Sequence, residues 1–237
     1  MTRTQLIITL FFVFNVFTAC KDKPSKVKEV KPEPESLKDS IKIDTIVPDV
    51  KREEFVLTEE NVIPFFFEYE KDLIEDKVKI TTNLGSFTLQ LYDNVPYHRA
   101  NFIYLTKKGY FDNTMFHRVV KDFIIQGGNA DNIETGQKRQ AIGRYLLPPD
   151  TKKGYRHDRG TLSMPSSELD NPHKLASPFE FFIVVTRPGS YHLDKNYTPF
   201  GKVIQGMDVV DFISNQPVEQ GDWPVQNIYI LKAEAFK

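Results

Sequence analysis

Residues 116–131 read FHRVVKDFIIQGGNAD, and the rest of the chain is best understood outward from this stretch. It places Arg118, just after a histidine, ahead of an apolar run that stops at Gln126 and two glycines. The paired glycines allow a sharp exit from a strand, because glycine adopts unusual backbone angles at little cost. An arginine close to apolar side chains and an amide is uncommon in a purely structural strand. The stretch therefore marks a candidate site as well as a candidate strand.

Alternation within this stretch predicts which side chains share a surface. Successive side chains of a strand point to opposite faces, so we expect Arg118 and Val120 on one face. We expect Phe123 and Ile125, a little further on, to lie near them. An arginine in a strand is ordinarily a solvated surface residue, and large apolar residues ordinarily belong to the core. On pattern alone, the structural and the functional interpretations both stay open.

Composition sets the class of protein. The chain has 237 residues, of which 40% are hydrophobic and 13% aromatic, enough to bury one sizeable core in one or two domains. A formal net charge of -1 gives no electrostatic argument for binding nucleic acid. The single cysteine, Cys20, rules out an intramolecular disulfide. No metal-ligand spacing is present among the histidines, and we interpret those other than His117 as surface or structural residues.

Residues 1–19 are typical of a secretion signal. Arg3 supplies a positive start, and residues 6–17 form an apolar core that is too short to span a bilayer but suits a signal peptide. Two small residues then lead to Cys20, and Phe-Thr-Ala-Cys resembles a bacterial lipobox, in which the cysteine receives a diacylglycerol and becomes the new N-terminus. The alternative is a cleaved secretion signal followed by an incidental cysteine.

Residues 20–54 have the composition of a disordered tether behind the lipidated Cys20. The segment is rich in Lys, Glu, Asp, Ser and Pro, and buries too little apolar surface to offset the entropy of ordering it. Its interleaved charges favour a solvated spacer over a charge-mediated binding segment. Lys21, rather than an aspartate, follows the cysteine. By resemblance to well-studied Gram-negative lipoproteins, this favours a lipid anchor in the outer membrane, facing the periplasm.

Residues 55–237 have the composition of a folded domain. Residues 55–76 contain the cluster IPFFF, and we expect this N-terminal extension to form a strap or short helix packed on the barrel. Alternating runs at 78–80 and 87–91 flank the turn signal Asn-Leu-Gly and predict a β-hairpin. Further strands are predicted at 115–126, 160–164, 180–186, 199–204 and 225–234, and helices at 96–108 and 207–214. Many short strands and few helices favour an all-β barrel or sandwich.

Four separated blocks carry a resemblance to one family. They read HRANFIYLTKKGYFDNTMFHRVV from His98, GTLSM from Gly160, FFIVV from Phe181 and HLDKNYTPFGKVIQGMDVVD from His192. In this order, across about residues 78–236, they closely resemble the cyclophilins, the peptidyl-prolyl cis/trans isomerases. The resemblance implies an all-β fold, a closed eight-stranded antiparallel barrel capped by two α-helices. It also implies a site on the outer surface of the barrel.

The resemblance implies a role for each residue of that site. Arg118 is implied as the catalytic residue. The residues implied to bind substrate are His117, Phe123, Ile124, Gln126, Pro165, Ser166, Glu180, Phe182, Leu193 and Tyr197. Of these, Phe123, Ile124, Phe182 and Leu193 would line a pocket for the proline ring. For His117, a packing or hydrogen-bonding role stays an equal alternative.

Prolyl isomerisation requires only that the twisted amide be favoured over both planar forms. The peptide bond has a rotation barrier of about 18–20 kcal/mol, and twisting it returns the lone pair to the prolyl nitrogen, where Arg118 can donate a hydrogen bond. Such a charge-assisted bond contributes about 1.5–3 kcal/mol, so a dry pocket and donors to the carbonyl side must supply the remainder. Because no bond is broken, no cofactor and no metal is expected.

Two departures from the family leave the turnover rate open. Glu180 stands where cyclophilins commonly have a glutamine, and a carboxylate there can pair with Arg118, either orienting the guanidinium or holding it away from the amide. Residues 165–179 form a longer loop than in minimal cyclophilins. The alternative function is therefore a non-catalytic proline-binding module or holdase chaperone.

The expected partners follow from the same reading. They are proline-containing segments of unfolded or exported polypeptides, together with a membrane that the chain reaches through its N-terminal lipid. Neither nucleic acid nor an oligomer is indicated, so a monomer is the default expectation.

Overall fold

The computed structural model describes residues 55–166 and 171–237. The predicted signal peptide at 1–19, the lipidation site Cys20 and the tether at 20–54 lie outside the described residues. Within the two described ranges, no helix combines the length and the apolar character needed to cross a membrane.

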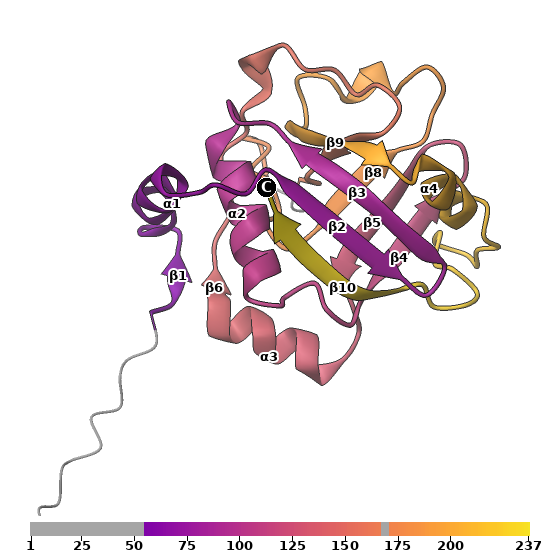
Figure 1. Ribbon diagram of the computed structural model, residues 1–237, viewed down its shortest axis with the longest axis horizontal. Helices are drawn as coiled ribbons and strands as arrows, with labels where there is room; N and C mark the ends of the chain where they lie inside the picture. The colour runs from indigo at the N-terminus through magenta and orange to yellow at the C-terminus, as the bar shows by residue number, and fades with distance from the viewer. Residues whose placement is uncertain (1–54, 167–170) are drawn as a thin grey trace, which may run out of the picture. The chain divides into compact units, whose positions relative to one another are not determined.

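Eight strands close into an antiparallel barrel (Figure 1). In chain order they are β2 (Lys77–Thr82), β3 (Gly85–Leu91), β4 (Thr114–Val120), β5 (Ile124–Asn129), β7 (Thr161–Ser163), β8 (Phe181–Val184), β9 (Pro199–Gln205) and β10 (Tyr229–Phe236). Around the barrel the order is β10-β2-β3-β9-β7-β8-β5-β4, and β4 pairs with β10 to close it. The prediction of a closed eight-stranded barrel is confirmed, as is the hairpin of β2 and β3. The single strand predicted at 115–126 is instead two paired strands, β4 and β5, joined by a turn at 121–123.

The barrel interior is filled by every second side chain of the strands, as the two-residue period requires. Val119 of β4, Ile125 of β5 and Ile183 of β8 are fully buried there. The expectation that Ile125 would lie near Arg118, on a face shared with Phe123, is therefore wrong. Phe123 lies in the turn before β5, so the alternation of faces starts only at Ile124. Ile124 faces outward, and Ile125 therefore faces the core.

Four α-helices occur in the described residues: α1 (Val62–Lys71), α2 (Pro96–Lys107), α3 (Ile133–Ile142) and α4 (Met207–Ser214). α2 and α4 are the two that the sequence predicted. α2 begins at Pro96, which suits a first helical turn because no backbone N–H is needed there. α3 was not predicted, because its sequence is mostly polar and contains a glycine. Its start is stabilised by Asn132, whose side chain accepts a hydrogen bond from the backbone N–H of Thr135 at 2.7 Å.

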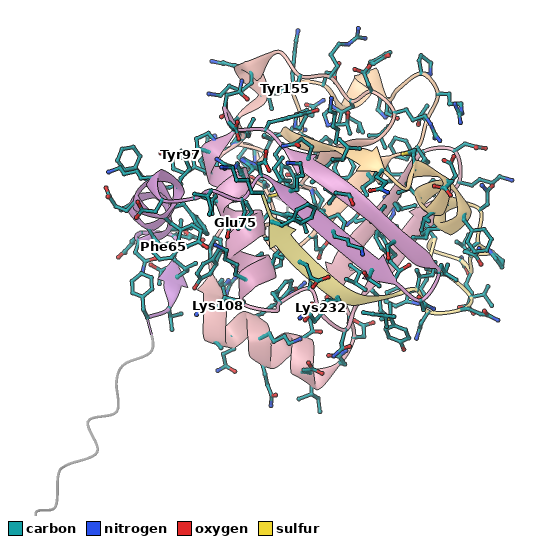
Figure 2. The ribbon with its side chains drawn as sticks, viewed as in Figure 1. Phe65, Glu75, Tyr97, Lys108, Tyr155 and Lys232 are labelled. Atoms are coloured by element: carbon teal, nitrogen blue, oxygen red, sulfur yellow. The ribbon has the colours of Figure 1, made fainter. Side chains whose placement is uncertain are left out.

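The N-terminal extension of residues 55–76 forms α1, which packs against α2. Phe66 of α1 is fully buried, and its ring contacts Tyr104 of α2 edge-on, with 5.8 Å between the centroids. Arg99 of α2 is buried and donates a hydrogen bond to the backbone carbonyl of Glu75 at 2.9 Å. Figure 2 shows Phe65 on α1 and Glu75 on the segment that leads towards β2. The expected short helix is thus present, but it packs mainly on α2 and not, as expected, on the barrel strands.

A short parallel pair joins the extension to the segment after α3. β1 (Leu57–Thr58) pairs with β6 (Gly143–Arg144), and Leu57 is fully buried. Gly143 has a φ of 128° and a ψ of -177°, a region that essentially only glycine occupies. A Cβ atom at this position would lie 1.9 Å from the carbonyl oxygen of Leu57. The absence of a side chain at Gly143 therefore allows β1 to dock beside the end of α3.

The substitution Gly143→Ala is expected to destabilise the domain by at least about 2 kcal/mol, because it adds backbone strain and a clash with Leu57. Gly136→Ala is the matched control, since Gly136 lies on α3 with nothing within 4 Å of an added Cβ. That control should stay within about 1 kcal/mol of wild type, or gain stability. Chemical denaturation of both variants measures the difference. Equal stabilities would contradict the β1–β6 arrangement.

Candidate functional site

Three neighbouring strands set a row of side chains on the outer surface of the barrel. Arg118 of β4 lies opposite Gln126 of β5, and Gln126 lies opposite Phe182 of β8. Residues directly opposite in antiparallel strands point to the same face, so these three share one surface. In Figure 1, β4 and β5 lie behind β2 and β3. The barrel thus brings together side chains from three predicted site segments.

An apolar cluster lies beside this row and is separate from the barrel core. Its members are Ile124, Phe182, Val184 and Leu193, all buried, with Val120, Phe123 and Tyr197 partly buried against them. Tyr197 meets the ring of Phe182 edge-on, with 5.7 Å between the centroids. Leu193 comes from the short 3-10 helix η2 (Tyr191–Leu193). The five apolar and aromatic residues predicted for the site are therefore in one place, which we call the outer apolar cluster.

A β-bulge places His117 near the same surface as Arg118. Along β4 the pairing passes from Phe116 opposite Gly127 directly to Arg118 opposite Gln126, so one residue of β4 is extra. That residue is His117, whose side chain is only 11% exposed. Its Nε2 atom lies 3.5 Å from Glu180 Oε2. Strict alternation would have sent His117 and Arg118 to opposite faces.

Glu180 contacts Gln126 and His117, and the expected pairing with Arg118 does not form. Gln126 Nε2 donates a hydrogen bond to Glu180 Oε2 at 2.9 Å. Glu180 lies two residues before Phe182, which displaces it by about 7 Å along the strand from the row that contains Arg118. Burial opposes its ionisation, but the contact with His117, the hydrogen bond from Gln126 and the charge of Arg139 prevail. The pKa of Glu180 consequently lies below its usual value.

Arg118 instead pairs with Asp222, a residue that the sequence pattern did not single out. Arg118 Nη2 lies 3.2 Å from Asp222 Oδ2, and both side chains are about 40% exposed. The loop after α4 docks on β4, where the backbone N–H of Val119 donates to the carbonyl oxygen of Asp222 at 2.8 Å. This contact depends on how the loop returns to the barrel between α4 and β10. No motif near Arg118 could have revealed it.

A buried polar network supports Phe182 from behind. The His157 ring is fully buried and stacks on Phe182, with 6.0 Å between the centroids. Its Nδ1 lies 2.8 Å from Asp194 Oδ1 and its Nε2 lies 3.2 Å from Ser163 Oγ. Burial lowers the pKa of His157 and outweighs the opposite effect of Asp194. His157 thus has the structural role expected for it, because its ring supports Phe182 of the outer apolar cluster.

Pro165 and Ser166 lie in the loop that follows β7. The carbonyl oxygen of Pro165 accepts a hydrogen bond from the backbone N–H of Ser177 at 2.8 Å. Ser166 pairs with Ala176, and its hydroxyl accepts a hydrogen bond from Asn171 Nδ2 at 2.9 Å. Pro165 and Ser166, two positions expected to bind substrate, are therefore held by contacts with the described residues 171–177 of the same loop.

Comparisons with known proteins agree on one family. Residues 77–235 match the family described as cyclophilin type peptidyl-prolyl cis-trans isomerase/CLD. A peptidyl-prolyl cis-trans isomerase-like 3 from Dictyostelium discoideum is 36% identical over 158 residues, covering 66% of this chain and 92% of that protein. A peptidyl-prolyl cis-trans isomerase-like 2 from Rhizopus delemar is 37% identical over 172 residues, covering 72% of this chain but 31% of that protein.

A solved structure agrees with the sequence comparisons. It is the crystal structure of a Cryptosporidium parvum cyclophilin type peptidyl-prolyl cis-trans isomerase in the presence of the dipeptide Ala-Pro. It superposes with a TM-score of 0.57 and 29% sequence identity, over 68% of this chain and 99% of that one. Sequence and fold thus identify the same family.

The lowered pKa of His157 predicts a pH dependence of stability. The unfolded chain binds a proton as the pH falls through about 6.5, while the folded protein resists it, so the stabilisation is complete above that pH and is lost below it. A His157→Gln variant should lose unfolding free energy less steeply between about pH 6.5 and 5. Burial lowers the pKa of His98 to about 3, and His98 contributes equally to both proteins. Identical slopes in denaturation curves would contradict the prediction.

Proposed function

The chain belongs to the cyclophilin-type peptidyl-prolyl cis-trans isomerases and is a peptidyl-prolyl isomerase, and we propose that it acts through Arg118 and the outer apolar cluster. The observation that carries this proposal is the register that sets Arg118, Gln126 and Phe182 opposite one another. A cation, an amide and an aromatic ring on adjacent strands match the three parts of a twisted prolyl amide. These parts are the nitrogen lone pair, the peptide backbone and the ring.

In the proposed mechanism, the proline ring packs on Phe182 between Ile124 and Leu193. Burial of the ring holds one side of the X–Pro bond while the other side rotates. As the amide twists, the prolyl nitrogen becomes an acceptor and Arg118 donates a hydrogen bond to it, an interaction absent from both planar forms. The bond contributes about 1.5–3 kcal/mol, so the apolar wall and Gln126 supply further discrimination.

The ion pair with Asp222 prepares Arg118 for this role. The pair is partly exposed, so solvent screens it and its contribution to stability is small. Its effect is on geometry, since it engages one nitrogen of the guanidinium and restricts the orientations of the others. A guanidinium has five N–H donors, and donors remain to meet the substrate after one faces Asp222. Asp222 therefore orients Arg118 without consuming its capacity to donate.

We further propose that the substrates are exported polypeptides and that the enzyme is anchored in the cell envelope by a lipid on Cys20. The support is the order of segments in the first 54 residues: a signal peptide, a lipobox-like tetrapeptide and a charged, proline-containing tether. A lipoprotein anchor carries more than one acyl chain, which is what stable attachment to a bilayer requires. Lys21 after the cysteine favours the outer membrane, on its periplasmic side.

Replacing Arg118 by alanine is expected to lower kcat/KM by about 10- to 100-fold, the equivalent of one charge-assisted hydrogen bond. Exchange spectroscopy on a panel of X–Pro peptides measures the rate. Arg187→Ala is the matched control, because Arg187 is 75% exposed on the loop after β8 and should leave the rate unchanged. An unaltered rate in Arg118→Ala would refute the site assignment. A wild-type protein that binds the peptides without accelerating exchange would favour the proline-binding module or holdase.

Replacing Cys20 by serine is expected to release the protein from the membrane fraction of a bacterial host, because the acceptor of the lipid is lost. Processing of the wild-type chain should be sensitive to globomycin and that of Cys20→Ser should not. Ser25→Ala, in the tether, is the control that keeps the anchor. Membrane fractionation with separation of inner and outer membranes reads out the location. A soluble wild-type protein would support the alternative of an incidental cysteine.

A further inference from the structure

Glu180 contacts Gln126 through one carboxylate oxygen and Arg139 of α3 through the other. We propose that Arg139 is a positioning residue for the isomerase site. It acts through Glu180, whose carboxylate holds Gln126 and His117 where they meet the substrate backbone. The inference rests on the function proposed above for Gln126. It explains why a family member with a carboxylate at position 180 can keep an ordered site.

The guanidinium of Arg139 is held by groups from two segments, one of which is in turn hydrogen-bonded to β5. Its Nε donates a hydrogen bond to the hydroxyl of Tyr110 at 2.9 Å, and that hydroxyl donates to the carbonyl oxygen of Gly128 in β5 at 2.7 Å. The guanidinium carbon lies 5.4 Å from the centre of the Phe179 ring, a cation–π contact. Its Nη2 faces Glu180 Oε1 at 3.8 Å, an ion-pair distance. The cation is thus fixed between the end of β5 and the start of β8.

The two oxygens of Glu180 serve different partners. Oε2 accepts the hydrogen bond from Gln126 and lies against His117, while Oε1 faces Arg139. The side chain of Glu180 is 19% exposed, so its negative charge is poorly solvated and depends on a nearby cation. Without Arg139, the carboxylate would either turn towards water or take up a proton. Either change loosens the hold on the amide of Gln126.

The N-terminal extension supports α3 and hence Arg139. The backbone carbonyl of Arg139 accepts a hydrogen bond from the N–H of Gly143, the residue that pairs with Leu57 of β1. Val56 and Leu57 also line a pocket of about 560 Å³ together with Arg139. Figure 1 shows α3 below the barrel and β6 rising from the end of α3 towards α2. The segment that anchors the extension therefore also orders the helix that carries the cation.

The charge at position 180 determines whether Arg139 matters. A glutamine there would satisfy Gln126 as a neutral partner and would need no cation behind it. Arg139 and Glu180 should therefore be coupled, so that the effect of removing one depends on the presence of the other. A purely structural Arg139, acting through Tyr110 and Phe179, would not show this dependence.

The test is a double-mutant cycle of Arg139→Gln, Glu180→Gln and the double variant, assayed for kcat and KM on a short Ala-Pro peptide. In the wild-type background Arg139→Gln is expected to raise KM by about 5-fold, with kcat altered less than about 2-fold. In the Glu180→Gln background the same change should alter KM by less than about 2-fold. The side-chain amide resonance of Gln126 should move with Arg139→Gln only when Glu180 is present.

Two controls separate charge from structure. Arg139→Lys keeps the charge and should retain most of the affinity. Lys138→Gln, the neighbouring cation on α3, should leave KM unchanged, because Lys138 pairs with Glu134 at 2.9 Å. An equal rise in KM in both backgrounds, or an unmoved Gln126 resonance, would overturn the proposal even if Arg139→Gln also destabilises the fold. If Arg118→Ala lowers the rate but the cycle is additive, only the role of Arg139 fails.

Discussion

The antiparallel pairing of β4, β5 and β8 is the constraint on which the rest of the site depends. It sends Val119, Ile125 and Ile183 into a dry barrel core and leaves Arg118, Gln126 and Phe182 on the outer wall. A packed interior has no room for a substrate, so binding has to occur on the outside. The outer apolar cluster is consequently a second, smaller hydrophobic group that the barrel core supports but does not include.

The charges of this wall are arranged in two separate pairs. Asp222 faces Arg118 on one side, and Arg139 faces Glu180 on the other. Had Glu180 reached Arg118, the donor proposed for the twisted amide would have been neutralised by a poorly solvated carboxylate. The separation follows from strand geometry, because Glu180 precedes β8 and lies two residues before Phe182, which places it near Gln126 rather than beside Arg118. The buried carboxylate at position 180 is thus accommodated by local partners.

Most of the barrel could be predicted from the sequence, and the reason is physical. Periodicity reports burial, and the β2–β3 hairpin carries a clear two-residue period and a turn signal, while α4 buries Val210 and Ile213 at helical spacing. α2 is buried along most of its length and was indicated by its start at Pro96 and by the Gly109 that follows its end. α3 was missed because its helical state depends on the Asn132 cap and on the packing of its end beside β1, more than on an apolar stripe. Ile125 was placed on the wrong face because its alternation was counted through the turn before β5. Alternation applies only within a strand, and β5 begins at Ile124.

Residue types and their spacing were enough to indicate the family, most of the strands and the set of apolar side chains that gather at the site. They carry this information because side-chain period and turn chemistry are local properties. The partners of the charged residues were decided by the tertiary structure alone. Arg118 meets Asp222, Glu180 meets Arg139 and His157 stacks on Phe182 because barrel closure and loop docking bring together segments that are distant in the sequence. Contacts between residues so far apart in the sequence produce no local sequence pattern, so only the folded chain reveals them.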